Sequence, residues 1–144
     1  MTHEDAGHYA AKHDPERKPV PAILAAVREA EKDGSVNCAI AHKIAGDHGV
    51  TPAEAGFTID FCEFRIARCQ LGLFGYSPAR SIVKPAESVT PELEALIRKG
   101  LENERLPCAT AWGIAAELGI PKMAVSSACE TLGIRIKPCQ LGAF

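Results

Sequence analysis

The sequence predicts a mainly α-helical fold with short β-strands, built from one structural unit that occurs twice in tandem. Residues 21–74 and 91–144 align over 54 positions without a gap, and 16 of these positions hold the same residue. The identities form two clusters, one typical of a helix with its closing turn and one typical of a short strand followed by a loop. Two copies of a unit at a fixed spacing indicate a tandem pair rather than a solenoid.

The repeat also predicts how the 144-residue chain is organised. We expect a flexible, solvated arm over residues 1–18, because charged residues, histidines and prolines dominate that stretch. The two units are predicted over 19–76 and 89–144, joined by a linker over 77–88 that contains two prolines. Units of this size bury little surface alone, so we expect them to pack on each other as an intrachain pseudo-dimer.

Composition and charge argue against several classes of protein. The chain is 47% hydrophobic and 24% charged, and its net charge of −2 gives no overall attraction to nucleic acid or to an anionic membrane. No stretch has the length and apolarity of a membrane span, and residues 1–5 lack the apolar run of a signal peptide. Six cysteines in a chain without a leader predict a cytoplasmic protein with reduced thiols.

Three helices are predicted in each unit. Pro21 and Pro91 fall in the first turn of the first helix, where proline is favoured, and Thr90 precedes Pro91 as an N-cap. The second helix is expected over residues 37–49 in one unit and 107–119 in the other, each ending on a glycine in the left-handed conformation. A third helix follows directly in both units.

The segment 114–126 resembles the helix-turn-helix of the winged-helix DNA-binding families. Ala115 supplies the small residue needed where the two helices cross, and Gly119 supplies the glycine of the turn. Val125 supplies the β-branched residue that faces the first helix of the motif. The first unit matches this pattern less well, since Gly56 lies inside its third helix and costs up to about 1 kcal/mol relative to alanine.

The resemblance implies that each third helix is a recognition helix and that a β-wing follows it. Segments 64–69 and 134–139 alternate apolar and basic residues, the pattern of a half-buried strand at the position of a wing. The chain after the second of these strands is too short for a full two-stranded wing, so we expect that wing to be truncated.

The same resemblance implies which residues would contact DNA. In the second unit, the third-helix positions expected to be exposed are Lys122, Met123, Ser126, Ser127 and Glu130; Lys122, Ser126 and Ser127 are the candidate DNA contacts. The strand residues expected to touch phosphates are Arg65, Arg68, Arg135 and Lys137. In the first unit the exposed set, Thr51, Ala53, Gly56, Phe57 and Asp60, holds no base-reading side chain. Its carboxylate would repel phosphates, which argues against sequence-specific recognition by that helix.

The cysteines divide into two groups. Cys62 and Cys129 fall on the buried stripe of the third helices and are interpreted as core residues. The other four are repeat mates, one opening the second helix and one ending the strand of each unit: Cys38, Cys69, Cys108 and Cys139. These four could form a metal or redox site, although no Cys-x-x-Cys spacing supports it. A second metal hypothesis, on His3, His8 and His13, is weakened because a spacing of five does not place them on one helix face.

The sequence therefore predicts a cytoplasmic DNA-binding or regulatory protein of the helix-turn-helix type, acting without a cofactor. Two alternatives stay open: a protein-interaction module that has the fold without DNA binding, and a cysteine-based metal or redox sensor. No nucleophile elbow, metalloprotease pattern or phosphate-binding loop occurs, so we expect no enzyme activity. The expected partners are double-stranded DNA, another protein or a second copy of the chain, and not a membrane.

Overall fold

Residues 7–144 are described by a computed structural model in which the chain forms two compact units. Unit 1 contains the chain up to Cys69 together with Gln140–Phe144, and unit 2 contains Gln70–Cys139. The chain therefore passes from unit 1 to unit 2 after Cys69 and returns to unit 1 after Cys139. These limits differ from the predicted units 19–76 and 89–144, because the segment after each strand belongs to the other unit.

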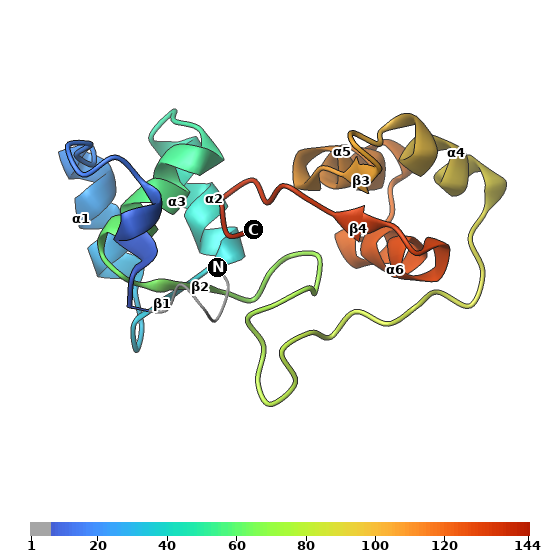
Figure 1. The fold of residues 1–144 in the computed structure, drawn as a ribbon, viewed down its shortest axis with the longest axis horizontal. Coiled ribbons are helices and arrows are strands. Elements are labelled where there is room, and N and C mark those ends of the chain that lie inside the picture. Colours follow the sequence, from blue (N-terminus) through green and yellow to red (C-terminus); the bar gives the residue numbers. More distant parts are fainter. Residues whose placement is uncertain (1–6) are drawn as a thin grey trace. The chain divides into compact units, whose positions relative to one another are not determined.

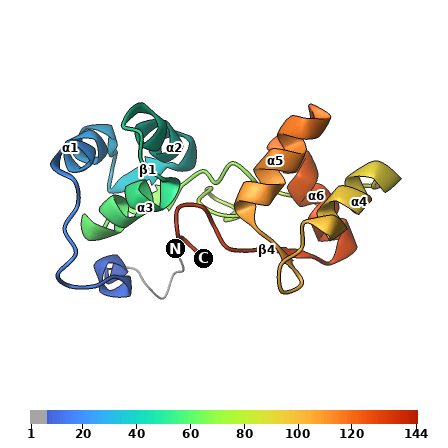
Figure 2. The same ribbon diagram turned by 90° about the horizontal axis from the view of Figure 1, so that it is seen from above.

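Unit 1 contains the 3₁₀-helix η2 (Tyr9–Lys12), three α-helices and two short strands (Figure 1). One strand lies between the first and second α-helices, and the other follows the third. In chain order they are α1 (Pro21–Ala30), β1 (Ser35–Asn37), α2 (Cys38–Asp47), α3 (Pro52–Phe61) and β2 (Arg65–Ala67). Figure 2 shows the three α-helices gathered around β1. The core is formed by aliphatic side chains, among them Ile23, Val27 and Ile59, which are at most 1% exposed.

Apart from η2, unit 2 has the same order of elements. It contains α4 (Pro91–Lys99), β3 (Arg105–Leu106), α5 (Cys108–Leu118), α6 (Lys122–Leu132) and β4 (Arg135–Ile136). The predicted mainly α-helical fold with short strands is confirmed. Within residues 7–144, no helix combines the length and the apolar composition required to cross a bilayer.

The predicted helix boundaries follow from local signals that the structure confirms. Thr90 caps α4, since its hydroxyl oxygen accepts a hydrogen bond from the backbone N–H of Leu93 at 3.2 Å. Gly119 closes α5 in the left-handed region with φ of 65°, and Gly49 follows α2 with φ of 64°. Ala115 and Val125 are both buried, as the packing of α5 on α6 requires.

The strands pair differently from a β-wing. Each predicted strand, β2 or β4, pairs in parallel with the short strand that precedes the second helix of its unit, β1 or β3. A wing is a hairpin formed after the third helix, and no strand follows β2 or β4 to complete one in the described part of the chain. The predicted strand positions are thus correct, but neither strand forms the β-wing that the resemblance implied. The parallel pairing therefore links the residues just before α2 or α5 to the residues just after α3 or α6.

Part of the predicted N-terminal arm has a defined place against α3. The backbone N–H groups of Tyr9 and Ala10 donate to the two carboxylate oxygens of Glu63, at 2.7 and 2.8 Å. Tyr9 is only 4% exposed. The first turn of the arm is thus held by Glu63, just beyond the end of α3, whereas residues 14–18 are exposed. His3 lies outside the described residues.

The segment 140–144 belongs to unit 1, where it lies against α3. Leu141 and Ala143 are 2% and 3% exposed. The backbone of Leu141 lies so close to Gly56 that a Cβ atom at position 56 would be 1.8 Å from the Leu141 carbonyl oxygen. Gly56 is therefore a requirement for close approach of this segment, and not a sign that the first helix-turn-helix has degenerated.

Candidate functional site

The third helix of unit 2 exposes only part of the face that was predicted to read DNA, since Glu130 is exposed but the other predicted positions are half-buried or buried. Ser126 is 0% exposed, and its hydroxyl donates to the carbonyl oxygen of Leu71 at 2.7 Å. The prediction that Ser126 is an exposed DNA contact is therefore wrong. The residue lies at the position that Gly56 occupies in unit 1, and both residues contact the backbone of a Gln-Leu-Gly segment.

The neighbouring candidates on α6 are also involved in contacts within unit 2. Ser127 is half-buried, and its carbonyl oxygen accepts a hydrogen bond from the N–H of Ala86 at 3.0 Å. The Lys122 ammonium lies 4.6 Å from the centre of the Trp112 ring on α5, a cation–π contact. Figure 1 shows the yellow-green segment before α4 running alongside α6. The chain that precedes α4 thus contacts α6 at Ser126 and Ser127, on the face that would have to enter a DNA groove.

The third helix of unit 1 is covered more completely. Phe57 and Asp60 were expected on its exposed face, but they are 2% and 1% exposed. The His13 ring lies 4.9 Å from the Phe57 ring in an edge-on arrangement, and the Arg17 guanidinium lies 3.8 Å from the Phe57 centroid. Arg17 also pairs with Glu54 at 2.7 Å. The chain before α1 therefore seals the face of α3 that would read DNA.

Asp60 forms the most buried charged cluster in the described residues. His13 Nε2 lies 2.7 Å from Asp60 Oδ2, and Lys12 Nζ lies 3.2 Å from the same oxygen. The second carboxylate oxygen, Oδ1, is buried without a hydrogen-bond partner. Burial raises the pKa of Asp60 above its ordinary value, and the contacts with His13 and Lys12 oppose that shift without cancelling it. The cluster fixes the arm on α3.

Exposed basic residues gather instead on the strand pair of unit 2. Arg105 of β3 and Arg135 of β4 are direct register partners, and Lys137 follows two residues after Arg135. Neighbouring positions on paired strands and positions two apart on one strand share a face of the sheet. All three side chains are exposed. The predicted phosphate contacts Arg135 and Lys137 are thus brought together, with Arg105 as a third member. We call these three residues the basic triplet.

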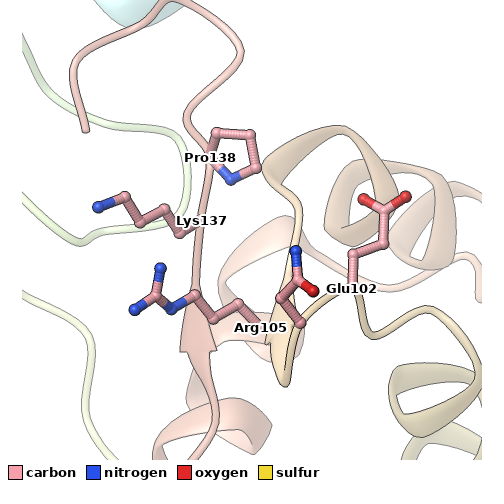
Figure 3. Close-up of a pocket in the computed structure, with 5 residues that line it drawn as sticks. Glu102, Arg105, Lys137 and Pro138 are labelled. Carbon is pink, nitrogen blue, oxygen red and sulfur yellow. The ribbon is translucent and has the colours of Figure 1, made fainter.

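A shallow hollow adjoins the basic triplet. It has a volume of about 460 Å³ and is lined by Glu102, Asn103, Arg105, Lys137 and Pro138. Figure 3 shows the Arg105 and Lys137 side chains extending to the same side, while the Glu102 carboxylate points the other way. The two cations can therefore approach one anionic group together, since the nearest carboxylate of the hollow is directed away from them.

Sequence reasoning missed Arg105, because its importance depends on a pairing between residues thirty positions apart. One signal was available: Arg105 belongs to an alternating Arg-Leu-Pro-Cys segment just before a predicted helix. Unit 1 does not repeat the triplet. Its register partners are Ser35 and Arg65, and Ala67 takes the place of Lys137. Arg65 and Arg68 are exposed, and Arg68 has a left-handed backbone with φ of 50°.

The repeat-mate cysteines lie at equivalent places in the two units. Cys38 and Cys108 open α2 and α5, and Cys69 and Cys139 follow the strands that pair with the preceding segment. In unit 2 the backbone N–H of Cys108 donates a hydrogen bond to the carbonyl oxygen of Pro138 at 3.0 Å. Cys139 directly follows Pro138, so this hydrogen bond brings the backbones of the two cysteines near each other. All six cysteines are thiols, and no group of three or more metal-ligating residues occurs within residues 7–144. The metal hypothesis on the four repeat mates gains no support from this arrangement.

The two remaining cysteines differ from each other. Cys129 is 1% exposed, as predicted for a core residue, and burial raises its pKa to about 11. Cys62 caps the end of α3 and is half-exposed, so its prediction as a core residue is wrong. Burial raises the Cys62 pKa as well, while Arg28 acts in the opposite direction.

Comparison of the chain with protein-family models, with curated proteins and with solved structures gave no match.

Proposed function

We propose that this chain is a cytoplasmic regulatory protein that works as a protein-interaction module, on a scaffold related to the helix-turn-helix but without a DNA-reading helix. One observation supports this choice: the centre of the outward face of each third helix is covered by other parts of the same chain. Major-groove recognition needs side chains that are free to reach base edges. Asp60 and Ser126, in the middle of those faces, are 1% and 0% exposed.

The basic triplet is the proposed contact surface, and an acidic protein segment is the proposed partner. Arginine binds a carboxylate through two parallel hydrogen bonds, so Arg105 and Arg135 suit successive Asp or Glu residues of an extended peptide. Lys137 adds a third positive charge on the same face. A short acidic segment can match three charges without contacting the rest of the surface.

Double-stranded DNA fits the same surface less well. A duplex presents long rows of phosphates, and the chain has a net charge of −2 with only one exposed basic residue in the corresponding strand pair of unit 1. DNA binding through Arg65, Arg68, Arg135 and Lys137 is therefore the competing outcome of the tests below.

The proposal is tested by measuring the binding of a fluorescein-labelled oligo-glutamate peptide by anisotropy. The test variant replaces Arg105, Arg135 and Lys137 with glutamine. The control variant removes the same charge from the exposed residues Lys18, Lys32 and Lys99. We expect the test variant to lose most of the binding, at least tenfold in Kd, which corresponds to about 1.4 kcal/mol. Equal weakening in both variants would show that only net charge matters and would contradict the assignment of the site.

A further inference from the structure

The chain contains the segment Gln-Leu-Gly-x-Phe twice, and each copy docks on a third helix. Residues 70–74 belong to unit 2, where Leu71 is 0% exposed and bonded to Ser126 of α6. Residues 140–144 belong to unit 1, where Leu141 is 2% exposed and lies against Gly56 of α3. Each segment therefore docks on the third helix of the other repeat: residues 70–74 of the first repeat on α6, and residues 140–144 of the second repeat on α3.

The residue under each segment is matched to the contact that it makes. At position 56 the backbone of Leu141 approaches to a distance that only glycine allows, because an added Cβ would lie 2.7 Å from the Leu141 carbonyl carbon. At position 126 serine donates to the Leu71 carbonyl, so that buried acceptor is satisfied. Lys12 adds a further contact in unit 1, donating to the Gly142 carbonyl at 3.3 Å. The docking depends on the segment's backbone and its buried leucine.

These contacts join the segment to the third helix and to Lys12 of the same unit, and they do not depend on which chain supplies the segment. We propose that Gln140–Phe144 of one copy of this chain can dock at Gly56 of a second copy, so that two copies associate by exchanging this segment. The repeat supports the idea, since the chain already exchanges the two segments between its own units. The partner at this site is therefore a second copy of the chain.

Docking within one chain competes with exchange between chains. A segment tethered to the same chain has an effective concentration of about millimolar, so wild-type protein at micromolar concentration is expected to be monomeric. Exchange between chains can be detected with two variants, one that lacks a working docking site and one that lacks a working segment. Gly56→Leu closes the site but retains the segment, whereas Leu141→Asp disables the segment but retains the site.

The test is to mix the two variants and measure the molar mass by light scattering after size-exclusion chromatography. Each variant alone is expected to be a monomer, and the mixture is expected to form a one-to-one dimer, since the segment of Gly56→Leu can dock on Leu141→Asp. Mixing either variant with the double variant Gly56→Leu/Leu141→Asp serves as the control and should give monomers only.

A second measurement shows whether the open site is intact. A labelled synthetic peptide of residues 137–144 should bind Leu141→Asp and should not bind the double variant, and circular dichroism should show equal helix content in all variants. A mixture that stays monomeric overturns the proposal, whether or not the peptide binds. A dimer that also forms with the double variant overturns it as well, since the contact would then lie elsewhere.

Discussion

Replacing Gly56 with alanine should destabilise the protein, although alanine is the better residue for a helix. Gly56 lies in the middle of α3, where the change would ordinarily stabilise by up to about 1 kcal/mol. Here the new Cβ would lie 1.8 Å from the carbonyl oxygen of Leu141, a backbone atom that cannot turn aside as a side chain does. The segment 140–144 must therefore shift away from α3 or leave it.

The size of the effect follows from what the segment buries. Leu141 is 2% exposed, and burying a leucine stabilises by about 1.5–3 kcal/mol. Setting the helix gain of about 1 kcal/mol against that loss leaves a net destabilisation of about 0.5–2 kcal/mol. We expect Gly56→Ala to unfold at lower denaturant concentration and to show faster hydrogen exchange at the amides of residues 141–144.

Gly46→Ala is the matched control. Gly46 lies in α2 and is exposed, and an added Cβ there would meet nothing within 4 Å. This change should stabilise the protein by about 0.5–1 kcal/mol. If Gly56→Ala stabilised by the same amount and left hydrogen exchange of the segment unchanged, the close contact between α3 and Leu141 would be refuted.

Three further predictions concern other parts of the chain. Glu104→Gly should raise the free energy of unfolding by about 0.4–1 kcal/mol in a urea titration, because Glu104 has φ of 66° where its repeat mate is Gly34; no gain would argue against that turn. The raised pKa of Asp60 means that the native state binds more protons than the unfolded state above pH 3.8, so its contribution to stability is complete below 3.8 and is lost as pH rises through the folded pKa. The stability of wild type relative to Asp60→Asn should therefore fall as pH increases from 3.8, and a rise would contradict the dominance of burial. Cys129, buried and with its pKa raised to about 11, should be alkylated more slowly than the half-exposed Cys139 at pH 8, as mass spectrometry of native protein would show; fast labelling of Cys129 would remove it from the core.

The helices could be predicted from the sequence because their signals are local. The proline of the first turn, the cap at Thr90 and the left-handed glycines at positions 49 and 119 act within a few residues of where they stand. The strand positions were also local, since alternation of apolar and basic residues marks them. Their partners were not, because parallel pairing of β3 with β4 joins segments thirty residues apart.

The candidate site was harder to predict, for the same reason. Ser126 and Asp60 were placed on exposed helix faces because the pattern of one helix shows only which face packs on its own unit. The segments that cover those faces come from residues 9–17, 71–86 and 141–143, far away in the sequence. Gly56 carried a signal, since a glycine inside a helix often marks close approach of another backbone, but the sequence did not reveal which segment approaches.

The central claim is that this chain contacts a partner through the basic triplet and does not insert a third helix into DNA. The most direct measurement is a titration of a labelled, mixed-sequence DNA duplex with wild-type protein at about 20 mM salt, where phosphate contacts are strongest. We predict no saturable binding at micromolar protein concentration. Saturable binding whose log K falls with log salt at a slope of about −3 or steeper, the value for three or more phosphate contacts, would contradict the claim and favour DNA as the partner.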